Sequence, residues 1–279
     1  MKKSDVELDG FRAYLLEKGK RQKTVEDYVR HITNFRKWLQ SEGNDLDNLT
    51  RYDVQQYMKH LQNQGNKATT MNPKFSAIVA YARYTGQPHL VENIQRPEIR
   101  HSRHISPQSL SRSDRNRLFR ELERSGNLRS IAIAYTLLYT GLRVSELVAL
   151  NRSDVHIGER SGQVIVRDGK GGIARTVPLP SEARYHLRRY LESREDDDPA
   201  LFLSNFKKRI SIRAVQRIFE KLGVHPHMLR HTYGRELVSS GIDIATVAEL
   251  MGHSDVNVTR RYAAPSMKDL EQAVEKVFG

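Results

Sequence analysis

Apolar side chains recur at helical spacing through the first third of the chain. Tyr28, Ile32, Phe35 and Leu39 fall on one face of a helix, because residues three and four positions apart share a face. Glycines follow this segment and the later periodic ones, as expected where helices stop. The pattern predicts a small all-helical domain over residues 1–96, with these aromatic and aliphatic side chains in its core.

The periodic pattern stops between Pro97 and Pro107. Residues 98–104 follow neither a helical nor a strand period, and prolines bound the stretch. This composition is typical of an extended connection between domains. We therefore predict an interdomain linker over residues 97–110, with basic side chains that suit a position along a phosphate backbone.

A second, larger domain is predicted over residues 111–279. The segment 131–139 is apolar almost all round, which indicates a buried central helix that ends at Gly141. Residues 163–167 and 174–178 alternate like strands on either side of a glycine-rich turn, as in a β-hairpin. The predicted fold class is mainly α: an N-terminal helical domain, then an α-rich domain with a small antiparallel β-sheet. Further periodic segments predict helices near 113–123, 181–194, 211–222, 228–240 and 243–252.

The charge balance indicates a polyanionic partner. The chain has 46 Lys and Arg residues against 33 Asp and Glu residues, which gives a net charge of +13 and a pI near 9.9. The basic excess is shared between the two predicted domains, so we expect both to contact the polyanion. Nucleic acid is the usual partner of such proteins, and an acidic membrane face a less frequent one. No segment approaches the roughly 18 consecutive apolar residues of a membrane span, so we expect no membrane association.

The absence of cysteine and of a secretory signal bears on the possible nucleophiles and on the cellular compartment. There is no cysteine, which excludes disulfides and thiolate nucleophiles. The basic residues after Met1 are not followed by the apolar segment of a secretory signal. We therefore expect a cytoplasmic protein.

Metal and nucleotide chemistry are not indicated either. His227 and His231 stand four positions apart, a spacing that can hold zinc on a helix. However, the residues between them include Arg230 and lack the glutamate of the metalloprotease signature, so a metal site is not expected there. No acidic cluster indicates a two-metal nuclease, and no glycine-rich loop ending in Lys-Ser/Thr indicates nucleotide use. We predict neither a metal nor a cofactor.

Four short motifs follow one another in the second domain. They are Thr-Gly-Leu-Arg-Val-Ser-Glu-Leu at 140–147, Gly-Lys-Gly-Gly-Ile-Ala-Arg at 169–175, His-Met-Leu-Arg-His at 227–231, and Gly-His-Ser at 252–254 with Tyr262 beyond it. In this order and spacing the chain resembles the tyrosine recombinases, the phage-integrase family that includes the Xer proteins. The resemblance covers both predicted domains. The family's functional positions fall on Arg143, Lys170, His227, Arg230, His253 and Tyr262.

One position departs from the family pattern. Ile173 stands in the hairpin where many members have a basic residue. The departure leaves the DNA contacts of the hairpin open but does not affect its lysine.

The resemblance implies phosphoryl transfer through a covalent protein–DNA bond. Arg143 and Arg230 would hold the two non-bridging phosphate oxygens, where charge grows at the transition state. Tyr262 would attack the phosphorus and form a 3′-phosphotyrosyl bond. Lys170 would protonate the 5′-hydroxyl leaving group. In this scheme His227 is expected to take the tyrosine proton. A further phosphate donor is expected at His253.

The resemblance also implies a site-specific recombinase acting on double-stranded DNA. Four protomers would bind two duplexes and exchange strands through a Holliday junction. We expect no extra arm-binding domain, which would favour resolution of replicon dimers or transposon co-integrates over integration or excision of a mobile element. The resemblance leaves the need for accessory proteins open.

Two other interpretations of the chain remain. One is a non-catalytic, architectural DNA-binding protein that shares the fold. The other is a topoisomerase-like enzyme that cleaves and reseals one strand without exchanging partners. A related question concerns the last segment, whose apolar stripe would pack either into a neighbouring subunit or onto its own domain. This stripe consists of Leu270, Val274, Val277 and Phe278.

Overall fold

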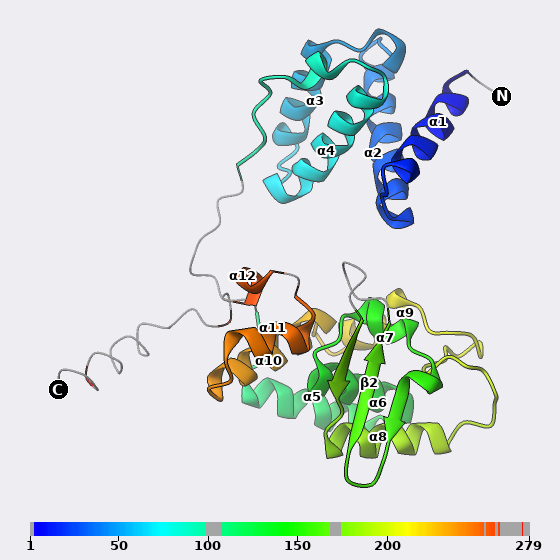
Figure 1. Ribbon diagram of the computed structural model, residues 1–279, viewed down its shortest axis with the longest axis vertical. Helices are drawn as coiled ribbons and strands as arrows, with labels where there is room; N and C mark the ends of the chain where they lie inside the picture. Colours follow the sequence, from blue (N-terminus) through cyan, green and yellow to red (C-terminus); the bar gives the residue numbers. More distant parts are fainter. Residues whose placement is uncertain are drawn as a thin grey trace. The chain divides into compact units, whose positions relative to one another are not determined.

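The computed structural model divides into two compact units, Met1–Ser102 and Arg103–Gly279, and each is described by itself. Both are mainly helical, and the second carries a small antiparallel sheet, so the predicted fold class is confirmed (Figure 1). Within the described ranges, none of the helices combines the length and apolarity needed to cross a bilayer. The structure describes residues 3–98, 108–167, 174–253, 255–259, 262 and 275.

The N-terminal unit is a helical bundle around the apolar face of α2 (Gln22–Ser41). Ile32, Phe35 and Leu39 are buried as predicted, whereas Tyr28 is only partly buried. Val25, one turn earlier, takes the fully buried position at that end of the stripe. The helix packs against its neighbours on both sides in the chain. The other elements of the unit are α1 (Lys3–Glu17), η1 (Leu46–Asn48), α3 (Arg51–Asn63), α4 (Ala68–Tyr84) and η2 (Pro88–Val91).

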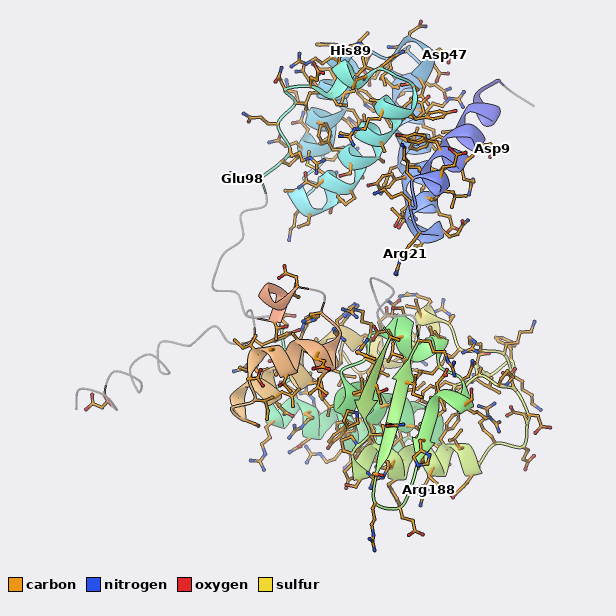
Figure 2. The ribbon with its side chains drawn as sticks, viewed as in Figure 1. Asp9, Arg21, Asp47, His89, Glu98 and Arg188 are labelled. Carbon is orange, nitrogen blue, oxygen red and sulfur yellow. The ribbon has the colours of Figure 1, made fainter. Side chains whose placement is uncertain are left out.

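Aromatic side chains fill the space between these helices. Phe11 of α1 meets Tyr81 of α4 edge to face, with ring centroids 5.3 Å apart. The sole tryptophan, Trp38, lies 5.1 Å from the ring of Tyr57. Charged side chains lie on the outside of the unit, as the labelled examples in Figure 2 show. The unit therefore has a core of its own, made from the residues whose spacing predicted it.

The C-terminal unit is built around α6 (Leu128–Thr140). Nearly every side chain of α6 is buried, as its all-round apolarity predicted. It packs against three other helices of the unit. Gly141 ends it in the left-handed conformation with φ 60°, where an added Cβ would collide with the ring of Tyr233. The other helices are α5 (Arg112–Arg124), α7 (Val144–Ala149), η3 (Arg152–Asp154), α8 (Ser181–Glu192), α9 (Ile212–Glu220), α10 (Pro226–Ser239), α11 (Ile244–Met251) and α12 (Val256–Thr259).

The predicted hairpin forms the main part of the sheet. β2 (Gly162–Val166) pairs antiparallel with β3 (Arg175–Pro178), so that Val166 lies opposite Arg175. A third strand, β1 (Val155–Ile157), pairs with the other edge of β2 and was not predicted. Its three residues are too few to show a period, and its pairing depends on a partner supplied by β2. The turn between β2 and β3 lies outside the described residues, and Lys170 with it.

A core substitution tests the N-terminal unit. We expect Ile78→Ala, at a side chain that is 1 % exposed, to lower the free energy of unfolding by about 2–5 kcal/mol. Leu16→Ala is the matched control, because Leu16 is 45 % exposed and its truncation should change stability by less than about 1 kcal/mol. Urea unfolding of the whole chain, followed by the fluorescence of Trp38, measures both. Equal costs for the two variants would contradict the assigned core.

Candidate active site

The carbonyl end of α11 gathers three arginines of the C-terminal unit. The helix ends at Gly252, which has φ 62°, and the carbonyl groups of its last turn lack partners within the helix. These carbonyls carry the negative end of the helix dipole, which favours cations. Each of three consecutive carbonyls accepts a hydrogen bond from a different arginine: Leu250 from Arg175 Nε at 3.1 Å, Met251 from Arg230 Nη2 at 2.6 Å and Gly252 from Arg143 Nη2 at 3.0 Å.

One buried carboxylate joins two of these arginines. Glu146 Oε1 and Oε2 accept hydrogen bonds from Arg175 Nη1 at 3.0 Å and Nη2 at 2.8 Å. Arg143 adds its Nη1 at 2.7 Å and its backbone N–H at 2.8 Å. The Glu146 side chain is only 3 % exposed. Burial alone would raise the pKa of this carboxyl, but the hydrogen bonds and charges of Arg175 and Arg143 lower it to about 2.

The third arginine is the most deeply buried. Arg230 projects from α10, and its Nη1 also donates a hydrogen bond to the carbonyl of Gly141. The residue is 4 % exposed. Burial, and after it the charge of Arg143, lowers the pKa of Arg230 to about 10. The guanidinium is still charged at neutral pH, but it lies where a counter-ion would stabilise it.

We call Arg143, Glu146, Arg175 and Arg230 the arginine cluster. Three guanidinium groups against one carboxylate leave two positive charges in excess. Arg175 uses three guanidinium donors, two on Glu146 and one on the Leu250 carbonyl. The hydrogen bonds above account for two of the five guanidinium N–H donors of Arg143 and of Arg230. The cluster therefore fits a compact anion with several acceptor oxygens.

Histidines and a tyrosine lie next to the cluster. His231 Nδ1 is 2.8 Å from the hydroxyl oxygen of Tyr262, within hydrogen-bond distance. The ring of Tyr262 lies parallel to that of His253, with centroids 6.4 Å apart and planes at 6°. His253 Nδ1 shares a hydrogen bond with the buried hydroxyl of Thr259 at 2.8 Å. His227 lies one turn before His231 on α10, with ring centroids 6.3 Å apart.

Burial and nearby positive charges lower the pKa of two of these imidazoles. Burial, and then the charges of Arg230, Arg143 and Arg175, lowers the pKa of His253 to about 4. The pKa of His227 is lowered too, first by burial and then by neighbouring cations that include Arg230 and Arg143. Both imidazoles are therefore neutral at neutral pH, so each has one N–H donor and one acceptor nitrogen.

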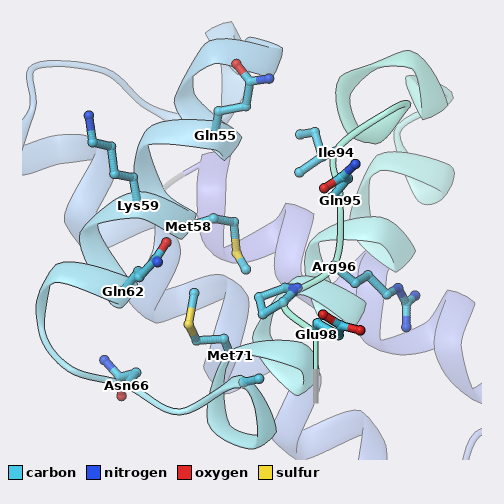
Figure 3. Close-up of a pocket in the computed structure, with 12 residues that line it drawn as sticks. Gln55, Met58, Lys59, Gln62, Asn66, Met71, Ile94, Gln95, Arg96 and Glu98 are labelled. Carbon is cyan, nitrogen blue, oxygen red and sulfur yellow. The ribbon is translucent and has the colours of Figure 1, made fainter. Parts of the chain in front are cut away.

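Two hollows differ in their relation to this site. One of 610 Å³ opens beside the arginine cluster and is lined by β3 and α11, including Arg175 and His253. The other, of 560 Å³, belongs to the N-terminal unit, where Met58 and Met71 point into it among amide and charged side chains (Figure 3). It shares no residue with the predicted site. In the described part of the chain, no three His, Asp or Glu side chains are grouped so that they could hold a metal ion.

Most of the residues predicted from the motifs come together. Lys170 lies outside the described residues, and so does the apolar stripe from Leu270 to Phe278. The other five are found around the arginine cluster and the tyrosine: Arg143, His227, Arg230, His253 and Tyr262.

The structure differs from the prediction in one pairing. His227 was expected beside the tyrosine hydroxyl, but the imidazole at hydrogen-bond distance from Tyr262 is that of His231. Glu146 and Arg175 were also missed. A signal for Glu146 was present, because an acidic residue three positions after Arg143 can cap the start of a helix. Arg175 has no comparable local signal, since its partners are 29 and 75 residues away.

Sequence profiles decide the family. The profile of the phage integrase family matches residues 108–269, and that of the N-terminal SAM-like domain of phage integrases matches residues 8–87. The chain belongs to the phage integrase family, the tyrosine recombinases. It is 31% identical to tyrosine recombinase XerA of Thermococcus kodakarensis over 96% of this chain and 94% of the relative. The expectation of a site-specific DNA recombinase is thereby confirmed.

Solved structures of recombinases share the fold. A crystal structure of XerA recombinase aligns with 25% identity and a TM-score of 0.54, covering 99% of both chains. A lambda integrase dimer bound to a COC′ core site aligns with a TM-score of 0.72 at 19% identity, covering 92% of this chain and 76% of that one. The family assignment therefore agrees with the architecture of both units.

The buried carboxylate predicts a pH dependence of stability. The pKa of Glu146 falls from its ordinary value of 4.5 to about 2 on folding, so its contribution is complete above pH 4.5 and is lost as the pH falls towards 2. The change corresponds to about 3 kcal/mol. We expect about 2 kcal/mol of this to be lost between pH 6 and pH 3, so that the stability difference between wild type and Glu146→Gln shrinks by that amount. Urea unfolding followed by circular dichroism measures it, with the exposed Glu195→Gln as control. A constant difference would contradict the assignment.

Alanine substitutions at two glycines distinguish the effect of backbone strain from the effect of displacing an arginine. Gly252 and Gly241 both have positive φ, but an added Cβ would lie 2.6–2.9 Å from the Arg175 guanidinium at Gly252 and would meet nothing at Gly241. We expect both alanine variants to lose about 1–2 kcal/mol from strain. Only Gly252→Ala should also lose DNA cleavage, by at least about tenfold, because it displaces Arg175. Cleavage of a nicked duplex compares them, and equal rates would contradict the role of this contact.

Proposed function

We propose that this recombinase joins Tyr262 covalently to DNA through a 3′-phosphotyrosyl bond and uses that bond to exchange strands. The observation that carries the proposal is the position of the Tyr262 hydroxyl beside a cluster with two excess positive charges. A phosphodiester has one negative charge, and attack by a phenolic oxygen adds charge at the phosphorus in the transition state. The cluster fits that more highly charged state better than the resting diester.

The proposed chemistry proceeds in two matched steps. The Tyr262 oxygen forms a bond to phosphorus while the bond to the 5′ oxygen breaks, and Lys170 supplies the proton that the leaving oxygen takes up. Arg143 and Arg230 hold the non-bridging oxygens, with His227 and His253 as further hydrogen-bond donors. Attack by a 5′-hydroxyl then reverses the step on a new strand. The phosphotyrosyl bond conserves the energy of the diester, so rejoining needs no nucleotide.

DNA is the proposed substrate for two reasons. The net charge of +13 favours a polyanion, and counter-ion release would make binding depend steeply on salt. The XerH site-specific recombinase was solved bound to its difH substrate in a pre-cleavage complex. A lambda integrase dimer was solved bound to a core site. By analogy, we assign residues 1–96 to DNA binding, 97–110 to the linker and 111–279 to catalysis.

The assembly and the biological role follow as further parts of the proposal. Four protomers would act on paired sites through a Holliday junction, and the C-terminal stripe would pack into a neighbouring subunit. Resolution of replicon dimers or transposon co-integrates in the cytoplasm is the proposed role, with integration or excision of a mobile element as the alternative.

A nicked suicide duplex tests the chemistry. Cleavage beside the nick releases a short strand and traps the covalent intermediate, so wild type should give a protein–DNA adduct that survives SDS. Tyr262→Phe should give none, a loss of at least about a thousandfold, while binding of DNA in a gel shift persists. Tyr185→Phe, at an exposed tyrosine, is the matched control.

The outcomes distinguish a recombinase from the two alternative functions, an architectural DNA-binding protein and a topoisomerase-like enzyme. An adduct with Tyr262→Phe would show that another residue attacks, and no adduct from wild type would favour an architectural DNA-binding protein. Two duplexes with different labels then test strand exchange. Resealing without any recombinant product would favour a topoisomerase-like enzyme.

A further inference from the structure

We infer that His231, and not His227, takes the proton of Tyr262 when the tyrosine attacks DNA. The inference rests on the proposed function and adds a residue that the motifs did not assign. Its basis is the 2.8 Å separation between His231 Nδ1 and the Tyr262 hydroxyl oxygen. A general base takes a proton across a hydrogen bond of about this length, roughly 2.6–3.2 Å between the two heavy atoms.

One face of α10 packs against the ring of Tyr262. His227, His231 and Gly234 are spaced by four and three residues, so they share a face of the helix. At Gly234 an added Cβ would lie 3.2 Å from Cε2 of Tyr262, which shows how closely the ring approaches the helix there. His231 stands between the other two, with its ring centroid 5.8 Å from that of Tyr262. The hydroxyl therefore meets the middle residue of this face.

The neighbouring imidazoles have other partners. His253 presents its ring parallel to Tyr262, and its Nδ1 shares a hydrogen bond with Thr259 Oγ1. His227 lies close enough to Arg230 and Arg143 for their charges to act on it, after burial, in lowering its pKa. Its ring stacks on that of His225, with centroids 5.4 Å apart. These contacts suit His227 and His253 to the phosphate and leave the tyrosine proton to His231.

The proton balance of the step is complete. In the tautomer that carries its hydrogen on Nε2, His231 presents the Nδ1 lone pair to the phenol. As the bond from the Tyr262 oxygen to phosphorus forms, the phenolic O–H bond breaks and the proton moves to Nδ1. The bond from phosphorus to the 5′ oxygen breaks at the same time, and that oxygen is protonated by Lys170. In the rejoining step the imidazolium returns its proton to the departing tyrosine, so one residue serves as base and then as acid.

Matched asparagine variants test the assignment in the full chain. Asparagine keeps a polar group near the position of Nδ1 but cannot take up a proton at neutral pH. With the nicked duplex under single-turnover conditions, we expect His231→Asn to slow adduct formation by about 10²–10⁴-fold with DNA binding unchanged. His227→Asn is compared under the same conditions, and His231→Gln replaces the first variant if it does not fold.

A change in the nucleophile distinguishes a base from a structural residue. Fluorinated tyrosine at position 262 is a stronger acid and loses its proton more readily without a base. It should therefore raise the rate of adduct formation by His231→Asn at least about tenfold. It should restore none of the rate lost in His227→Asn. A substrate with a 5′-thiol leaving group, which needs no protonation, should restore neither.

Failure of this inference can be told from failure of the proposed function. If Tyr262→Phe forms no adduct but His231→Asn reacts at the wild-type rate, only the inference is wrong. If fluorinated tyrosine does not help His231→Asn, or helps His227→Asn instead, the assignment to His231 is also overturned. An adduct formed by Tyr262→Phe would overturn the proposed function itself.

Discussion

The site depends on hydrogen bonds between arginine side chains and the carbonyl end of α11. Guanidinium groups repel one another. Three of them can gather here because three successive residues each provide one carbonyl oxygen, and each oxygen accepts a hydrogen bond from a different arginine. Glu146 then links two of the three, and its pKa of about 2 shows how strongly the arginines hold its charge. The left-handed Gly252 makes this possible, because it ends the helix and leaves room for the Arg175 guanidinium.

The arginine cluster joins parts of the chain that are far apart in sequence. Arg143 comes from the start of α7, Arg175 from β3 and Arg230 from the middle of α10. Gly141, at the end of the buried helix α6, accepts a hydrogen bond from Arg230 and so fixes the position of that side chain. The core of the C-terminal unit thereby determines the geometry of the charges, because α6 and α10 pack directly against each other.

Local patterns predicted the elements well and the contacts between them poorly. The apolarity of α6 and the alternation of β2 and β3 follow from residues a few positions apart, and both were recognised. The motifs also marked Arg143 and Arg230, because the family resemblance supplies their order. Arg175 could not be predicted in the same way, since its role depends on how β3 meets α11. His231 was noticed only as one of a pair with metal-ligand spacing, and its contact with Tyr262 spans 31 residues.

The same charges are costly to bury and supply the chemistry once DNA is bound. Burying Arg230 with one carboxylate in the cluster is unfavourable without a further anion, as its lowered pKa shows. A phosphate there would add a negative charge, so part of the unfavourable energy of burying Arg230 would be recovered on binding DNA. Burial, and after it the charges of neighbouring groups that include Arg230 and Arg143, also lowers the pKa of His227 and of His253. Neutral imidazoles can donate a hydrogen bond to the phosphate without adding charge that would bind the resting diester too tightly. The positive charge is therefore concentrated on the arginines, which cannot pass protons at neutral pH, and proton transfer falls to other side chains.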